Sequence, residues 1–168
     1  PKEVQAYIWT EIVRRKIMNQ AELLRYQDLE ESDLLYQYID ELTLNDETQR
    51  EGHAAKVYFN ALFGKSFSRD QDNPINAALN YGYAIIRSYL AKLCVGYGLN
   101  SQIGIHHRSE YNRFNLIDDL IEPFRPFVDY YAYNLLDGQE YFKREHRIKL
   151  INILNHQFVY NNKKMYMS

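Results

Sequence analysis

The chain has 168 residues, a single cysteine, 46% hydrophobic residues and a formal net charge of -2 at neutral pH. This length and composition suit one domain with its own hydrophobic core, and the lone cysteine excludes a disulfide framework within the chain. The mild acidity gives no electrostatic sign of nucleic-acid binding. No run approaches the roughly 18 apolar residues that a membrane span needs, so we expect a cytoplasmic protein without a membrane partner.

Helical periodicity dominates the first third of the chain. Apolar residues recur among charged ones over 2–27, without glycine or proline, and predict a long first helix. A second, short helix is expected in ESDLLYQYIDEL, with Ser32 or Asp33 as its N-cap. A third, at about 46–63, would begin after Asn45 as a cap and end at a glycine.

The middle of the chain predicts a loop followed by a long helix. Residues 64–73, GKSFSRDQDN, lack periodicity and indicate a surface loop. Asn73 followed by Pro74 is typical of a helix start, and the apolar pattern then continues until Gly96 and Gly98. We therefore expect a long central helix there.

The last third again favours helices. Apolar helical patterns run through about 137 and from 140 to 156. The segment 157–167, QFVYNNKKMYM, has two alternating runs around an Asn-Asn turn and predicts a small β-hairpin near the C-terminus. The sequence therefore predicts an all-α, multi-helix fold, with residues 1–168 forming one domain.

A glutamate stands on the predicted buried face of the third helix. Positions 51, 54, 55, 58 and 62 share one face, and all except Glu51 are apolar or aromatic. A buried carboxylate needs a compensating cation, metal ion or proton. Glu51 therefore either belongs to a site or pairs with a nearby arginine such as Arg50.

The stretch 104–126, GIHHRSEYNRFNLIDDLIEPFRP, crowds ionisable groups onto a segment that keeps a helical apolar stripe. Its first ten residues predict a loop that holds His106 and His107, which are either ligands or ordinary surface histidines. A helix should follow, anchored in the core by Leu116, Leu120 and Phe124.

The expected helix carries several acids. Asp119 and Glu122 stand three residues apart on one face, and Asp118 and Glu122, four apart, share a face equally well. Pro123 should bend the helix beside these acids, because it has no backbone N–H to donate. Spacing alone leaves open which aspartate accompanies Glu122.

An imidazole with two or three carboxylates forms an oxygen-rich donor set. Such a set suits Mn²⁺ or Mg²⁺ better than Zn²⁺, and it serves phosphate chemistry in nucleases and transesterases. A Walker-type glycine loop, an adjacent His-Asp pair and a glycine-flanked serine are all missing from the sequence. These patterns favour metal-dependent phosphodiester chemistry.

A resemblance to a known family rests on the order and spacing of three stretches. They are 51–64 (EGHAAKVYFNALFG), 73–90 (NPINAALNYGYAIIRSYL) and 104–126. Together they resemble the catalytic domain of the CRISPR-associated integrase, the adaptation endonuclease, in its type II form. The likeness covers about 45–130. It implies an all-helical catalytic domain that follows a β-rich N-terminal dimerisation domain, so the chain is expected to be a fragment without that domain.

The resemblance also implies roles for individual residues. The catalytic residues and divalent-metal ligands that it implies are Glu51, His107 and Glu122. It favours His107 over His106, and Asp119 over Asp118 as an auxiliary ligand or a support for the ligands. Support of the site or of DNA phosphates is suggested for a further four residues, namely Asn76, Tyr83, Arg113 and Arg125.

The function implied by the resemblance is a metal-dependent DNA endonuclease and integrase of CRISPR adaptation and antiviral defence. A 3'-hydroxyl of a prespacer would attack a phosphodiester at the repeat border, with Mn²⁺ or Mg²⁺ as cofactor. The implied partners are prespacer and CRISPR repeat DNA, a second copy in the full-length homodimer and a small second CRISPR-associated adaptation protein. In type II systems the effector nuclease and a ring-forming adaptation protein would join them.

Two further features leave alternatives open. The basic runs RRK (14–16) and KREHRIK (143–149) either contribute to a DNA-binding face or are solvated helix faces. As a different class of function, the chain would be a noncatalytic helical scaffold of the adaptation complex, with its acids and histidine forming a structural ion network. Metal-dependent DNA cleavage distinguishes the enzyme from the scaffold.

Overall fold

The computed structural model describes residues 1–155 and the backbone of 157–160 and 163–166. The α-helices are α1 (Lys2–Tyr26), α2 (Glu31–Asp40), α3 (Arg50–Phe63), α4 (Pro74–Gly96), α5 (Asn115–Leu120), α6 (Arg125–Leu136) and α7 (Arg144–Ile151). Short 3-10 helices are η1 (Leu44–Asp46), η2 (Glu122–Phe124) and η3 (Asn152–Asn155). The all-α class is therefore confirmed.

The C-terminal strands β1 (Gln157–Tyr160) and β2 (Lys163–Tyr166) pair antiparallel, with Gln157 opposite Tyr166. The predicted Asn-Asn turn at 161–162 lies outside the described residues. No helix in the described part of the chain is long and apolar enough to cross a membrane.

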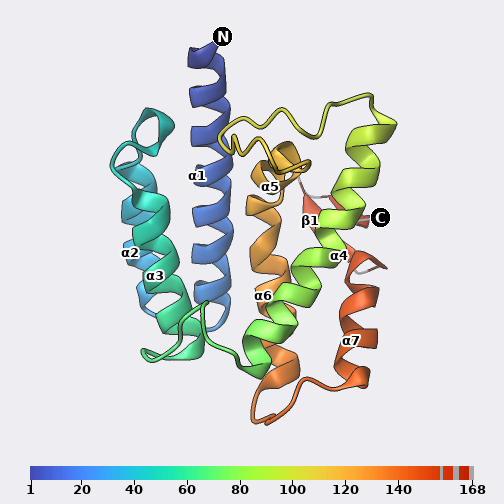
Figure 1. The fold of residues 1–168 in the computed structure, drawn as a ribbon. Coiled ribbons are helices and arrows are strands. Elements are labelled where there is room, and N and C mark those ends of the chain that lie inside the picture. The colour runs from blue at the N-terminus through green and yellow to red at the C-terminus, as the bar shows by residue number, and fades with distance from the viewer. Residues whose placement is uncertain (156, 161–162, 167–168) are drawn as a thin grey trace.

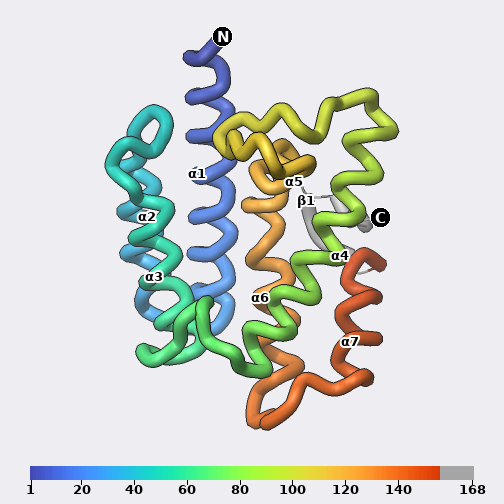
Figure 2. Tube along the Cα trace, viewed as in Figure 1, coloured from blue at the N-terminus to red at the C-terminus, as the bar shows by residue number. Residues whose placement is uncertain are grey.

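Figure 1 shows α1 between two groups of helices, with α2 and α3 on one side and α5 and α6 on the other. Helix α4 crosses beside α6, and α7 packs against α4. The long loop 97–114 crosses one end of the bundle from α4 toward α1 and then returns to α5 (Figure 2). This path places the loop beside the N-terminal half of α1, next to the start of α5.

Two hydrophobic clusters form the core on the two sides of this arrangement. The first joins α1, α2 and α3 through fully buried Val13, Ile17, Leu24, Leu35 and Tyr58. The second joins α4, α6 and α7 through fully buried Leu79, Val128, Ala132 and Leu150. The segment from α5 to η2 supplies residues to the boundary between these clusters.

The turn before α3 corrects a prediction. Asn45 was expected to cap this helix, but its backbone has φ 61° and its N–H donates to Thr10 Oγ1 at 2.7 Å. The residue at the N-cap position is Gln49, whose side chain makes no capping bond; instead the Asp46 carboxylate accepts the backbone N–H of Arg50 at 2.7 Å and of Glu51 at 3.0 Å. These bonds satisfy amides that the helix leaves without partners, and they fix the turn that carries Glu51.

Two other helix starts differ from the sequence expectation. Helix α2 begins at Glu31, without a side-chain cap, so neither Ser32 nor Asp33 is its N-cap. Helix α7 begins at Arg144 rather than near 140. Periodicity locates both helices, but helix ends depend on local capping contacts that periodicity does not report.

Helix α4 keeps its predicted bounds. The side chain of Asn73 accepts the backbone N–H of Asn76 at 2.8 Å, and Gly98, just beyond the helix, has φ 72°. Gly82, in the middle of α4, lies against Val128 of α6, where an added Cβ would come within 2.4 Å of Val128 Cγ1. A glycine at this position therefore allows α4 and α6 to approach closely.

The buried face of the segment from α5 to η2 is not the predicted one. Leu116, Leu120 and Phe124 are half-buried, although the last two pack against the core clusters. Ile117 and Ile121 are the apolar residues that are fully buried. The helix is rotated relative to the expectation because acids of the same segment also face inward.

Candidate functional site

Two carboxylates from distant segments meet at one lysine. The Nζ atom of Lys16, on α1, lies 2.6 Å from Glu51 Oε1 and 2.5 Å from Glu122 Oε2. Arg125 Nε donates to the other oxygen of Glu122 at 2.9 Å. We call these four residues the carboxylate cluster. Its formal charge is zero, because two cations balance two carboxylates.

The carboxylate cluster is largely withdrawn from solvent. Lys16 is 9% exposed and Glu122 is 6% exposed. Burial alone would raise the pKa of Glu122, but Lys16 and Arg125 outweigh it and lower that pKa below its ordinary value. Burial likewise acts to lower the pKa of Lys16, whereas Glu122 and Glu51 raise it overall. Glu122 and Lys16 therefore both remain charged at neutral pH.

The completely buried Asp119 organises the loop that holds the two histidines. Its Oδ2 accepts the backbone N–H of Ile105 at 2.6 Å and of His106 at 3.0 Å, and its Oδ1 accepts that of His107 at 3.1 Å. The same Oδ1 lies 2.6 Å from Nδ1 of the His107 ring. Nδ1 is therefore committed to Asp119, which leaves Nε2 as the ring atom for a ligand.

The histidine loop is also fixed from its other side. The ring of buried Trp9 stacks on His106 with a centroid distance of 4.1 Å and meets the edge of His107 at 6.2 Å. A Cβ at Gly104 would come within 2.0 Å of the His107 carbonyl oxygen, so a larger residue does not fit there. His106 thus holds the loop in place, while His107 is the histidine bound to the buried acid.

The adjacent aspartates take different roles. Asp118 forms an ion pair with Arg87 at 2.6 Å on the outer side of the helix, and Asn112 donates to it at 2.7 Å. Burial acts to raise the pKa of Asp118, but Arg87 and Asn112 lower it overall. Asp119 faces inward and binds the loop. Of these two aspartates, Asp119 is therefore the one that contacts His107.

The three predicted ligands form two neighbouring groups rather than one. Glu51 and Glu122 share Lys16, whereas His107 binds Asp119. Among the described residues, no group of three or more His, Cys, Asp or Glu side chains is close enough to hold a metal ion. The donor types nevertheless fit a hard divalent ion, because two carboxylates, one of them buried, already converge on a single cation, the Lys16 ammonium.

A cavity of about 200 Å³ adjoins the carboxylate cluster, and its lining includes Lys16, Glu122 and Arg125. Tyr83 and Arg69 also line it, with the Arg125 guanidinium 4.6 Å and the Arg69 guanidinium 5.4 Å from the centre of the Tyr83 ring. Tyr83 and Arg125, two of the residues suggested to support the site or DNA phosphates, therefore both line the cavity beside the carboxylate cluster.

Asn76 does not line this cavity, but it binds Arg69, which does. Its side chain accepts from Arg69 and donates to two backbone carbonyls of the preceding loop, those of Ser68 at 2.8 Å and Gln71 at 2.9 Å. Asn76 therefore positions Arg69 and its loop. Arg113 does not line the cavity; it is exposed, and its carbonyl accepts from the Ser101 hydroxyl at 2.9 Å.

Three residues at the site were not singled out from the sequence. They are Lys16, Arg69 and Asp129. A signal existed for Lys16, because positions 13, 16, 17 and 20 share a helix face and the other three are buried. Arg69 lies in a loop without periodicity, so its place could not be predicted.

Asp129 forms a buried network beneath the cavity. It is completely buried and accepts the hydroxyl of Tyr58 at 2.8 Å and that of Tyr83. Burial raises the pKa of Asp129 to about 6, although both hydrogen bonds oppose this rise. Burial, followed by the charge of Asp129, also raises the pKa of each tyrosine well above its ordinary value.

Asp129 should make the stability of the fold depend on pH. Its folded-state pKa exceeds the ordinary value of 3.8, so the folded chain binds this proton more tightly than the unfolded chain. Between pH 6 and 4 the native chain should gain about 1.4 kcal/mol per unit of falling pH relative to Asp129→Asn. Urea unfolding of both chains measures this difference, which should be constant above pH 7. A constant difference from pH 4 to 8 would contradict it.

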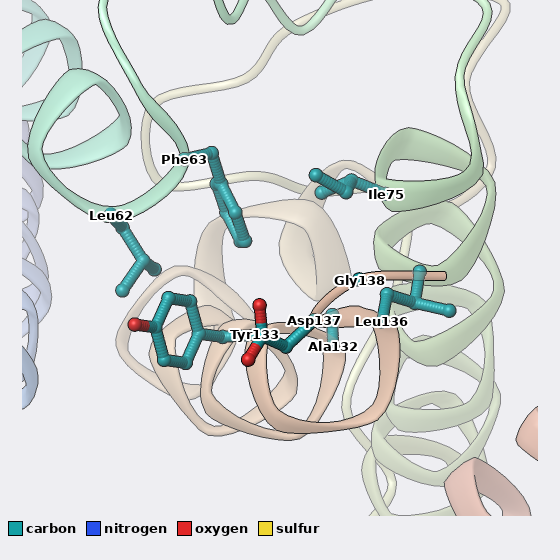
Figure 3. A pocket seen from close by; sticks show the side chains of 8 residues that line it. All are labelled: Leu62, Phe63, Ile75, Ala132, Tyr133, Leu136, Asp137 and Gly138. Carbon is teal, nitrogen blue, oxygen red and sulfur yellow. The ribbon is translucent and has the colours of Figure 1, made fainter. Parts of the chain in front are cut away.

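A different cavity lies between the end of α3, the start of α4 and the end of α6 (Figure 3). Its lining is Leu62, Phe63, Ile75, Ala132, Tyr133, Leu136, Asp137 and Gly138. Asp137 is the one carboxylate in that lining, and no residue predicted for the site takes part. This cavity is therefore not the candidate site.

Comparisons with known proteins agree on one family. The family described as CRISPR associated protein Cas1 matches residues 2–154. A CRISPR-associated endonuclease Cas1 from Neisseria meningitidis is 45% identical over 126 residues, which cover 73% of this chain and 40% of that protein. The chain thus spans about two fifths of the length of that relative.

Solved structures share the fold at lower identity. A Cas1 protein from Thermotoga maritima has a TM-score of 0.82 and 21% identity, covering 99% of this chain and 61% of that one. A casposase bound to an integration product has a TM-score of 0.73 and 21% identity, covering 99% and 60%. A partial Cas6-RT-Cas1–Cas2 complex has a TM-score of 0.74 and 22% identity, covering 91% and 58%. At these identities the likeness is one of fold.

Proposed function

The chain belongs to the CRISPR-associated Cas1 family, and on that premise we propose that it carries a metal-dependent site for DNA cleavage and integration. The observation that carries the proposal is the meeting of Glu51 and Glu122 at one buried cation. A histidine held by the buried Asp119 completes the donor set. Two relatives support DNA cleavage and integration as the chemistry. The Neisseria protein is named an endonuclease, and the casposase structure contains an integration product.

Glu51, Glu122 and Nε2 of His107 would hold Mn²⁺ or Mg²⁺, which when bound stabilises negative charge on phosphodiester oxygens. Asp119 keeps the proton of the neutral His107 ring on Nδ1, so that Nε2 presents its lone pair. The guanidinium groups of Arg69 and Arg125 line the adjoining cavity and offer paired donors to a DNA phosphate.

The reaction we propose is a direct transesterification. The 3'-hydroxyl oxygen of a prespacer end forms a bond to a phosphorus atom at the repeat border, and the bond from that phosphorus to the original 3'-oxygen breaks. The attacking hydroxyl gives up its proton and the leaving oxygen takes one up, so there is no net change in protons, and no covalent bond to the protein forms. Water in place of the 3'-hydroxyl gives hydrolysis of branched or single-stranded DNA.

Full integration is proposed to need more than this chain. The chain spans about 40% of its Neisseria relative, and a second copy of the protein is proposed as a partner from the resemblance alone. The Cas1–Cas2 complex among the structural neighbours supports a small second CRISPR-associated protein as partner, together with prespacer and repeat DNA. The type II effector nuclease and a ring-forming adaptation protein remain proposals from the resemblance alone.

The test separates the enzyme from a noncatalytic scaffold. A labelled oligonucleotide ending in a 3'-hydroxyl is incubated with the protein, repeat DNA and Mn²⁺, and compared with the same oligonucleotide ending in a 3'-dideoxynucleotide. We expect a joined product from the first donor, none from the second, and none from either in EDTA. A scaffold would give no metal-dependent product from any donor.

A further inference from the structure

Lys16 occupies the place between the two proposed ligand carboxylates. Its ammonium contacts Glu51 at 2.6 Å and Glu122 at 2.5 Å, whereas Arg125 contacts the other oxygen of Glu122. Glu122 Oε2 is buried and lacks a hydrogen bond of good geometry, so the Lys16 ammonium is its counter-charge. The lysine side chain is itself 11% exposed, compared with 28% for Glu51.

We propose that Lys16 is the resident cation of this site and competes with the divalent ion for the two carboxylates. Its contacts with Glu51 and Glu122 join α3 and η2 to α1. For one divalent ion to bind both carboxylates, the Lys16 ammonium has to leave its place between them. This inference rests on the proposed metal site, and it assigns Lys16 a positioning role rather than a catalytic one.

The charge of the carboxylate cluster supports competition. Lys16 and Arg125 together neutralise Glu51 and Glu122, so the free cluster has no excess negative charge to attract a divalent ion. A divalent ion bound to the same oxygens would also repel an ammonium a few ångströms away, and partial burial strengthens that repulsion relative to water. Removal of the lysine charge leaves the cluster at -1, which favours binding of a divalent ion.

The contacts of Lys16 also account for the separation of the proposed ligands into two groups among the described residues. The two glutamates close around the ammonium, while His107 stays with Asp119. Lys16 also lines the adjoining cavity of about 200 Å³, so its side chain has space to turn away from the carboxylates while the helix stays in place. Exchange of the cation therefore needs a change of side-chain rotamer rather than a change of fold.

The test measures Mn²⁺ affinity by calorimetry on the protein without DNA. Lys16→Met, which keeps the aliphatic stem without the charge, should bind Mn²⁺ about tenfold more tightly than the native chain. Lys16→Arg keeps the positive charge and should bind no more tightly than the native chain. Affinity of Lys16→Met equal to or below that of the native chain would overturn the proposal, as would equal tightening in Lys16→Arg.

Two further readouts keep the test decisive. Lys16→Met should melt at a lower temperature without metal, and Mn²⁺ should raise its melting temperature more than that of the native chain. A purely structural lysine would lower the metal-free melting temperature without this larger rise. Glu51→Gln separates the two proposals: if it leaves Mn²⁺ affinity unchanged, the metal site itself is wrong. If it weakens affinity and Lys16→Met does not strengthen it, the competition alone is wrong.

Discussion

Replacement of His107 by alanine should lower the rate of Mn²⁺-dependent DNA cleavage by about a hundredfold or more, because the site loses its imidazole donor. His106→Ala should lower the same rate by less than about tenfold. The two histidines are neighbours, but the ring of His107 is bound to buried Asp119 while that of His106 stacks on Trp9. Initial rates on a branched DNA substrate measure both effects.

The fold should survive both histidine substitutions. The His107 side chain is 45% exposed, so its removal costs little packing, and the melting temperatures of the two variants should lie close together. Circular dichroism provides this control. Equal loss of cleavage in His106→Ala and His107→Ala, at equal stability, would contradict the assignment of His107.

Replacement of Asp119 by alanine should lower the free energy of unfolding by about 3 kcal/mol or more. Its completely buried carboxylate is the acceptor for the partly buried backbone N–H groups of Ile105, His106 and His107, and a buried donor left without a partner costs about 1–3 kcal/mol. The histidine loop would also lose its anchor, so cleavage should fall together with stability.

The neighbouring aspartate provides the matched control. Asp118→Ala removes an ion pair with Arg87 whose side chains are 21% and 39% exposed, so the expected loss is about 1 kcal/mol or less. Urea unfolding of the two variants at neutral pH measures the contrast. Similar losses for Asp118→Ala and Asp119→Ala would show that Asp119 does not hold the loop.

The helical fold could be predicted from periodicity, but several helix ends could not. The pattern in 2–27 corresponds to α1, and Asn73 caps α4 as expected. Asn45 was chosen as a cap because its residue type favours that position, whereas the Asp46 carboxylate accepts the first N–H groups of the helix. That exchange depends on Thr10, which binds the backbone of Asn45 from a helix 35 positions away. A local sequence window does not contain this contact.

The sequence pointed to the acids, the histidine and Arg125 at the candidate site, but not to Lys16 or Arg69. Motif spacing left His106 and His107, and Asp118 and Asp119, as open pairs, since neighbours in a helix or loop have similar sequence signals. The fold separates them by burial, because Asp119 faces inward under the histidine loop. Lys16 belongs to the basic run RRK at 14–16. A charged residue in such a run usually indicates a solvated helix face, so the sequence did not point to Lys16 as part of the site.

The central claim is that Glu51 and Glu122 form a site for a divalent ion that acts on DNA. Its most direct measurement is Mn²⁺-dependent DNA cleavage by the native chain, Glu51→Gln and Glu122→Gln, with Glu31→Gln as an exposed carboxylate control on α2. We predict that cleavage is lost in both site variants and retained in Glu31→Gln, with EDTA abolishing it throughout. Native rates of cleavage in folded Glu51→Gln and Glu122→Gln would contradict the claim.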